Sequence, residues 1–294
     1  MKRLHGTGVA LVTPFLKDGS VDYKALRKVL QHTARGVDYY VVMGTTGESA
    51  TLSRQEKLDV LAFVRANNPK ALPIVYGIGG NNTQHVLEEI KFTDLSGVDA
   101  LLSVSPYYNK PSQDGIYRHF TLVADASPLP IILYNVPRRT GSNITAETTL
   151  KLASNRKIIG IKEASGNLEQ CMKIAMSKDR GFLLISGDDM WTVPLYSMGA
   201  EGVISVLANA FPVEFDKMYE ASKAGDFIKA SEYAFSLLAI NGPMYEEGNP
   251  VGVKYLMSLM DICKSHVRLP HAEPSLALKK KIEAAFKAMK KRRR

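Results

Sequence analysis

Short apolar runs alternate eight times with longer amphipathic stretches along this sequence, and that alternation excludes most fold classes. The apolar runs occupy 8–14, 37–43, 72–78, 98–104, 129–135, 157–163, 181–187 and 201–207. The stretches of helical periodicity that follow them occupy 22–35, 53–66, 83–96, 113–126, 145–154, 167–178, 189–198 and 212–224. Runs this apolar are typical of parallel strands that are covered on both faces. Eight such units predict a TIM (β/α)8 barrel.

A doubly wound open sheet is the alternative for such an alternation. It usually has fewer strands, and it needs a glycine-rich phosphate-binding turn after the first strand. The segment TPFLKDGS at 13–20 contains no such turn. After residue 225 the alternation stops, and helices are predicted at 226–240, about 250–262 and 273–290. We therefore expect a barrel with the active site at 1–225 and a helical region with a basic tail at 226–294.

The net charge of +9 is concentrated at the C-terminus. Residues 279–294 hold nine Lys or Arg and one Glu, so this stretch carries +8 and leaves about +1 for the rest. A nucleic-acid site would spread its basic residues over a folded face. The pattern favours a solvated helix end with a basic tail over an anionic partner, and it predicts no nucleic-acid partner.

The cysteines, the histidines and the lengths of the apolar runs indicate which cofactors and which cellular compartment to expect. Cys171 and Cys263 lie far apart, which indicates free thiols. The six histidines show no ligand spacing with Cys or carboxylates, so we expect no metal and no cofactor. No run reaches the roughly 18 apolar residues that a membrane span requires, and the N-terminus does not resemble a signal peptide. We expect a cytoplasmic protein without membrane association.

Lys162 is the most informative residue for chemistry. The active site of a TIM barrel lies at the carboxyl ends of its strands, and Lys162 ends the sixth predicted strand within IIGIKEA. Burial there would disfavour the charged amine, and a neutral amine can attack a carbonyl to form a Schiff base. The alternative is an ordinary lysine that pairs with Glu163 or Asp188. Lys162 alone does not decide between the two.

The other strand ends favour the Schiff base. GTTGES at 44–49 offers hydroxyls and backbone N–H groups that can hold a carboxylate, although a capped helix start is also expected there. Tyr134 ends the fifth strand, where a phenol can relay protons. One of Arg138 and Arg139 can bind a second carboxylate. Together these groups predict carbon–carbon bond formation or cleavage with a 2-keto acid through an enamine.

Five segments then resemble the dihydrodipicolinate synthase family, within the superfamily of N-acetylneuraminate lyase and related class I aldolases. They are GTTGES, SPYYNKPS, YNVPRRTG, GIKEASGN and SGDD, in that order. The resemblance covers essentially the whole chain and implies condensation of pyruvate with L-aspartate 4-semialdehyde in lysine and diaminopimelate biosynthesis. A sister enzyme that releases pyruvate from a sugar acid is the alternative, and YNVPRRTG argues against it. A non-catalytic scaffold is a distant third.

The resemblance also implies roles for single residues. Lys162 would form the Schiff base, and Thr45, Tyr134 and Tyr108 would relay protons. Thr45 and Thr46 would hold the pyruvate carboxylate, and Arg139, rather than Arg138, would bind the carboxylate of the semialdehyde. Gly187 and Ile204 would line the pyruvate pocket through their backbone. Tyr108 would enter a neighbouring subunit, which implies a homotetramer built as a dimer of dimers.

Relatives that lysine inhibits carry an effector site at the subunit interface. The corresponding positions here are Ser49, Ala50, Arg54, Lys57, Asn81, His85 and Tyr107. Arg54 and Lys57 stand where sensitive relatives often carry histidines, and His85 stands where they carry a glutamate. Two added cations repel a lysine ammonium, and the lost carboxylate removes an attraction. We therefore expect weak or absent inhibition by lysine.

Overall fold

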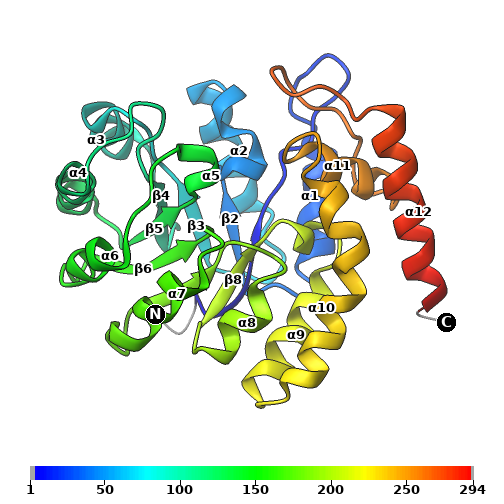
Figure 1. Cartoon of the computed structure of the whole chain (residues 1–294). Coiled ribbons are helices and arrows are strands. Elements are labelled where there is room, and N and C mark those ends of the chain that lie inside the picture. The colour runs from blue at the N-terminus through cyan, green and yellow to red at the C-terminus, as the bar shows by residue number, and fades with distance from the viewer. Residues whose placement is uncertain (1–3, 293–294) are drawn as a thin grey trace.

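The computed structural model describes residues 4–292 and contains the expected barrel. Its eight strands are parallel and closed, because each pairs with the next along the chain and β8 pairs with β1 (Figure 1). The strands are β1 Gly6–Ala10, β2 Tyr39–Val42, β3 Ile74–Gly77, β4 Ala100–Val104, β5 Ile131–Asn135, β6 Ile158–Glu163, β7 Leu183–Ser186 and β8 Gly202–Ser205.

Helices alternate with these strands and cover the barrel from outside. They are α1 Tyr23–Thr33, α2 Arg54–Ala66, α3 Thr83–Phe92, α4 Gln113–Ala126, α6 Ala146–Ala153, α7 Leu168–Ser177, α8 Thr192–Ser197 and α9 Pro212–Lys223. The one-turn helix α5 Pro137–Thr140 directly follows the carboxyl end of β5. Short 3-10 turns are η2 Thr45–Gly47, η3 Ser49–Thr51 and η4 Leu207–Asn209. Side chains cap the N-termini of at least two of these helices. Ser53 forms a capping box with Glu56, and the Thr145 side chain accepts from the backbone of Thr148.

The first strand differs from its prediction at 8–14, since it occupies Gly6–Ala10. The residues after it stay apolar because other elements bury them, not because they continue the sheet. Val12 N–H donates to the Asn209 side chain, and the Thr13 hydroxyl donates to Gly47 O. Pro14 then has no N–H to donate to a ladder. Apolar character alone therefore misplaced this strand by a few residues.

Two apolar cores lie on the two sides of the barrel wall. Alternate strand residues fill the inside, as Tyr39, Val41 and Ile185 do, whereas their neighbours pack under the outer helices. This division follows from the two-residue period of a strand. Because both faces are buried, most strands read as continuous apolar runs, and this is why they were visible in the sequence.

Strand β6 contains an irregularity that changes the direction of its side chains. Ile159 belongs to the inner core, whereas Ile161, two residues further on, belongs to the outer core. Residues two apart in a regular strand point to the same face. The register with β5 shifts between Ile131 and Ile132, so β6 carries one extra residue at this point. Such a bulge reverses the faces of all the residues that follow it.

Helices beyond the barrel form a C-terminal region, as predicted. They are α10 Phe227–Asn241, the turn η5 Gly242–Met244, α11 Val251–Ser258 and α12 Leu276–Arg292. Figure 1 shows α10, α11 and α12 along one side of the barrel, with α10 beside α9. Helix α12 takes up most of the basic stretch, and residues 293–294 of the predicted tail lie outside the described residues. Within residues 4–292, no helix is long and apolar enough to span a membrane.

Candidate active site

A cavity of about 500 Å³ lies at the carboxyl ends of the strands. The predicted site residues that line it are Thr45, Thr46, Tyr134, Arg139, Lys162 and Gly187. The C-terminal region contributes Asn241, Gly242, Tyr245, Gly248 and Asn249 to its wall. The barrel and the helical region therefore build this cavity together.

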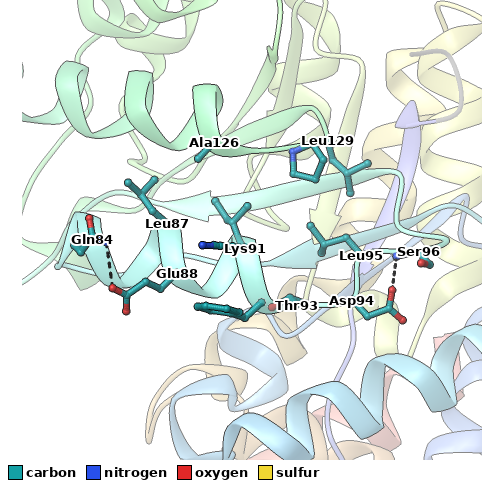
Figure 2. Close-up of a pocket in the computed structure, with 13 residues that line it drawn as sticks. Gln84, Leu87, Glu88, Lys91, Thr93, Asp94, Leu95, Ser96, Ala126 and Leu129 are labelled. Atoms are coloured by element: carbon teal, nitrogen blue, oxygen red, sulfur yellow. Dashed lines mark hydrogen bonds between the residues drawn. The ribbon is translucent and has the colours of Figure 1, made fainter.

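A second hollow of about 890 Å³ lies outside the barrel, beside α3 and the end of α4 (Figure 2). Leucines such as Leu87 and Leu129 form much of its wall. Its charged residues, Glu88, Lys91 and Asp94, are all exposed. Hydrogen bonds with Ser96 at the surface, and not burial, lower the pKa of Asp94 to about 2. Catalytic groups are usually desolvated by burial, and none of these charged residues is buried. The smaller cavity is therefore the candidate active site.

Lys162 lies after the β6 bulge and points into this cavity. It pairs with Tyr134 across the β5–β6 ladder, and its Nζ lies 4.4 Å from the centre of the Tyr134 ring. Only 5% of the lysine is exposed. Burial lowers the pKa of Lys162 from 10.5 to about 8, the nearby Asp189 carboxylate opposes this shift, and the Arg139 charge adds to it. A large share of the amine is therefore neutral at mildly alkaline pH.

The alternative in which Lys162 pairs with Glu163 or Asp188 is wrong. Glu163 points away from the cavity, where it accepts from the Asn135 amide at 3.0 Å and the Gln170 amide at 2.9 Å. Asp188 accepts from the backbone N–H of Met190 at 2.9 Å. Neighbours in sequence point to opposite faces of a strand, so Glu163 could not share the inner face with Lys162.

One glycine leaves room for this lysine, and a second glycine lets β6 pass close to β7. A Cβ added at Gly187 would lie 2.6 Å from the Ala164 Cβ and 3.1 Å from the Lys162 Cγ. A Cβ added at Gly160, within the bulge, would lie 2.6 Å from Leu183 O. Both positions need glycine because another chain segment passes close to them.

Tyr134 is a phenol held inside the barrel. Burial raises its pKa, whereas the Arg139 charge and a hydrogen bond with the Thr45 side chain lower it. Thr45 begins the turn η2 and, unlike Tyr134, is exposed. A phenol between an amine and a second hydroxyl can pass a proton in either direction.

The GTTGES turn is fixed to the C-terminal region at two points. The Asn249 side-chain amide donates to Thr46 Oγ1 at 3.0 Å. Glu48, which has a left-handed backbone with φ of 54°, forms a fully buried ion pair with Lys254. The Arg268 backbone N–H donates to the other oxygen of Glu48 at 3.0 Å. These contacts join residues about 200 positions apart in the sequence.

Both arginines of YNVPRRTG line the cavity, although only Arg139 was predicted to act there. They lie on the one-turn helix α5. The positive charge of Arg139 lowers the pKa of both Tyr134 and Lys162, so it acts directly on the two central groups. Arg139 is therefore the better placed of the two to hold an anion beside Lys162.

Two predicted residues do not reach the cavity. Tyr108 is 87% exposed on the loop after β4, with φ of 73°, and its N–H donates to Thr140 O at 3.2 Å. Ile204 is buried in the inner core of the barrel, where it packs with residues such as Tyr134 and Ile185. The Tyr108 side chain is therefore exposed outside the cavity, and Ile204 is part of the inner core of the barrel.

The sequence reasoning missed Asp189, Tyr245 and Asn249. Burial raises the pKa of Asp189 to about 6, and its Oδ2 accepts from Leu207 N–H at 2.9 Å and from the Tyr245 hydroxyl at 3.2 Å. SGDD was recognised as a strand end, but nothing local distinguishes its two aspartates. The other two residues lie in the helical region, where no pattern marks a contact with a distant turn.

The predicted effector positions lie on neighbouring elements. They are Ser49 and Ala50 in η3, Arg54 and Lys57 in α2, Asn81 just before α3, His85 in its first turn, and the exposed Tyr107. Lys57 Nζ lies 3.5 Å from Glu89, and Arg54 donates to Phe92 O at 3.2 Å. The sequence reasoning did not foresee that Glu89, on α3, offsets the charge of Lys57.

The described residues contain no group of three or more His, Cys, Asp or Glu that could hold a metal ion. The cavity therefore provides amine, phenol, hydroxyl and guanidinium groups for chemistry. These functional groups suit a substrate that contains both a carbonyl group and a carboxylate.

Comparisons with known proteins agree with that chemistry. Residues 3–289 match the model of the dihydrodipicolinate synthetase family. A 4-hydroxy-tetrahydrodipicolinate synthase from Cytophaga hutchinsonii is 49% identical, over 97% of this chain and 96% of that protein. The solved synthase from Methylacidiphilum fumariolicum SolV is 35% identical with a TM-score of 0.94, over 98% and 96% of the two chains. A dihydrodipicolinate synthase from Cyanidioschyzon merolae with lysine bound is 36% identical with a TM-score of 0.91, over 98% of each chain.

Proposed function

Because the chain belongs to the dihydrodipicolinate synthetase family, we propose that it is a lyase that condenses pyruvate with L-aspartate 4-semialdehyde to 4-hydroxy-tetrahydrodipicolinate. The observation that carries this proposal is the buried Lys162 amine, whose pKa is lowered to about 8. A neutral amine in a cavity that also contains carboxylate-binding groups suits a 2-keto acid.

The reaction begins when the Lys162 amine attacks the keto carbon of pyruvate. Loss of water then forms the imine, and removal of a methyl proton gives the enamine. The enamine carbon attacks the aldehyde carbon of the second substrate, and this step forms the new C–C bond. The amino group of the semialdehyde then displaces Lys162 and closes the ring. Tyr134, with Thr45 beside it, moves the protons of these steps.

Two anchors hold the two carboxylates. The hydroxyls of Thr45 and Thr46 and the backbone of their turn bind the pyruvate carboxylate. Arg139 binds the carboxylate of the semialdehyde, since a guanidinium can contact it bidentately. The backbone of Gly187 lines the pocket beside Lys162, with Ile204 beneath it. No metal or other cofactor takes part in these steps.

The substrate assay that tests this function compares L-aspartate 4-semialdehyde with sugar acids. With pyruvate and the semialdehyde, we expect formation of the ring product. With N-acetylneuraminate or a 2-keto-3-deoxy sugar acid, we expect pyruvate release at least about a hundredfold slower, because a carboxylate is missing opposite Arg139. Comparable or faster cleavage of a sugar acid would instead assign the chain to the sister activity.

Assembly and location complete the proposal. Tyr108 projects from its own subunit and is 87% exposed, which suits its entry into the active site of a neighbouring copy. The chain acts as a homotetramer, a dimer of dimers, in the cytoplasm. An exposed tyrosine with a left-handed backbone is costly in a monomer, and a partner surface offsets that cost.

Lysine should inhibit this enzyme weakly or not at all. Arg54 and Lys57 remain cationic residues at the predicted effector site, His85 replaces a carboxylate, and Glu89 is already engaged with Lys57. A lysine ammonium therefore meets repulsion at these positions. The solved relative from Cyanidioschyzon merolae, in contrast, has lysine bound. Steady-state assays with up to about 10 mM lysine should retain most of the activity. Half-inhibition below about 1 mM would contradict the prediction.

A further inference from the structure

We propose that Asn249, in the C-terminal region, is a positioning residue that directs the hydroxyl proton of Thr46 towards the carboxylate of bound pyruvate. This inference rests on the proposed function, because it concerns the carboxylate anchor of the same site. It gives the C-terminal helical region a role in substrate binding, because Asn249 lies outside both the barrel and the five sequence motifs.

The contact itself sets the direction of the hydroxyl. The Asn249 amide Nδ2 donates to Thr46 Oγ1 at 3.0 Å, and both side chains are buried and line the cavity. A hydroxyl that accepts from one neighbour keeps a single proton to donate elsewhere. Among the described residues, Thr46 has no acceptor for that proton. The proton therefore remains available to an acceptor inside the cavity.

A carboxylate is the acceptor that gains most from this arrangement. A hydrogen bond to a charged group is roughly twice as strong as one between neutral groups. If Thr46 donated to Asn249 instead, its proton would be used within the protein and its lone pairs would face the anion. The amide donor thus makes Thr46 a carboxylate donor before the substrate arrives, so binding does not have to reorient it.

The backbone of the turn is held by a separate contact. Lys254, in the first turn of α11, forms a buried ion pair with Glu48. Glu48 lies two residues after Thr46 in the sequence. The Arg268 backbone N–H holds the second oxygen of Glu48. Because these contacts place the main chain, the task left to Asn249 is the orientation of one hydroxyl. A substitution at Asn249 should therefore change pyruvate binding without displacing the turn.

Asn249→Asp is the decisive variant, because it keeps the size of the side chain and removes the N–H donor. At pH 8 the new carboxylate takes the Thr46 proton and faces the substrate anion. We expect the half-saturating pyruvate concentration, measured by borohydride trapping on Lys162, to rise at least about tenfold. The KM for the semialdehyde and the kcat at saturating pyruvate should change less than about threefold.

The pH dependence distinguishes positioning from a merely structural role. A protonated aspartic acid can again donate to Thr46, so the ratio of mutant to wild-type half-saturation should fall as the pH is lowered from about 8 to about 6. Asn249→Ala loses the donor without adding charge, so it should raise half-saturation by a smaller factor, about threefold to tenfold, that does not recover at low pH.

Glu56→Gln is the matched control. Glu56 also joins the C-terminal region to the barrel, through Arg268 at 2.9 Å, but it lies on α2 and not at the cavity. It should lower the Tm slightly and leave half-saturation by pyruvate unchanged. A half-saturation in Asn249→Asp and Asn249→Ala equal to that of the wild type would overturn the inference. If the wild-type chain traps no pyruvate, the proposed function itself fails, which is a different result.

Discussion

Replacement of Lys162 by alanine should abolish the covalent adduct with pyruvate. With borohydride, the wild-type chain gains the mass of a reduced pyruvate imine on Lys162, and the variant gains none. We expect kcat to fall by at least about three orders of magnitude. Removal of a catalytic nucleophile that acts together with partner groups typically lowers the rate on this scale. Intact-mass spectrometry with peptide mapping measures the first effect, and product formation measures the second.

The variant should still fold, because Lys162 faces a cavity of about 500 Å³ and not a filled core. Lys157→Ala is the matched control. Lys157 lies just before the same strand, where its amine donates to Ser127 O at 2.9 Å, far from the cavity mouth. It should form the adduct normally. A pyruvate adduct that persists in Lys162→Ala, on another lysine, would contradict the assignment.

The pH dependence of the same reaction follows from the pKa of Lys162. Only the neutral amine attacks the keto group, and burial lowers this pKa to about 8. The rate of adduct formation should therefore rise with pH through about 8 and level off above it. A rate that kept rising towards pH 10.5, the ordinary value, would mean that the cavity does not desolvate the amine.

Replacement of Tyr134 by phenylalanine should lower kcat by about a hundredfold or more. General acid–base groups typically contribute about 10² to 10⁴ to the rate, and the Tyr134 phenol is the buried proton donor beside Lys162. The ring, which fills the inner core under the amine, is retained in this variant. Adduct formation should be slow but should reach completion on long incubation, since the nucleophile remains. Steady-state kinetics and time-resolved trapping separate the two effects.

Tyr40→Phe is the control for this variant. Tyr40 lies on strand β2 of the same barrel, but its hydroxyl donates to Leu30 O at 2.9 Å outside the barrel. Its loss should cost about 1 kcal/mol of stability and leave the rate unchanged. Equal rates for Tyr134→Phe and the wild type would remove Tyr134 from the proton relay.

The fold followed from the sequence because a closed parallel barrel buries both faces of each strand. That burial forces continuous apolar runs, and the intervening helices must be amphipathic, so both signals survive in one chain. The prediction was wrong at strand ends such as residues 11–13. Leu11 and Val12 are apolar because other elements bury them, although they lie outside strand β1. The strand ends also identified Lys162, Tyr134, Thr45 and Arg139, because a barrel brings those ends together at one face.

The sequence by itself thus determined the barrel, the family and the list of groups at the mouth. The tertiary structure alone decided how those groups act. The extra residue in β6 turns Lys162 inward, and desolvation there lowers its pKa to about 8. Asn249 and Lys254 hold the GTTGES turn from about 200 residues away in the sequence. Periodicity reports burial along one segment, whereas a bulge, a desolvated amine and a distant hydrogen bond depend on where several segments meet.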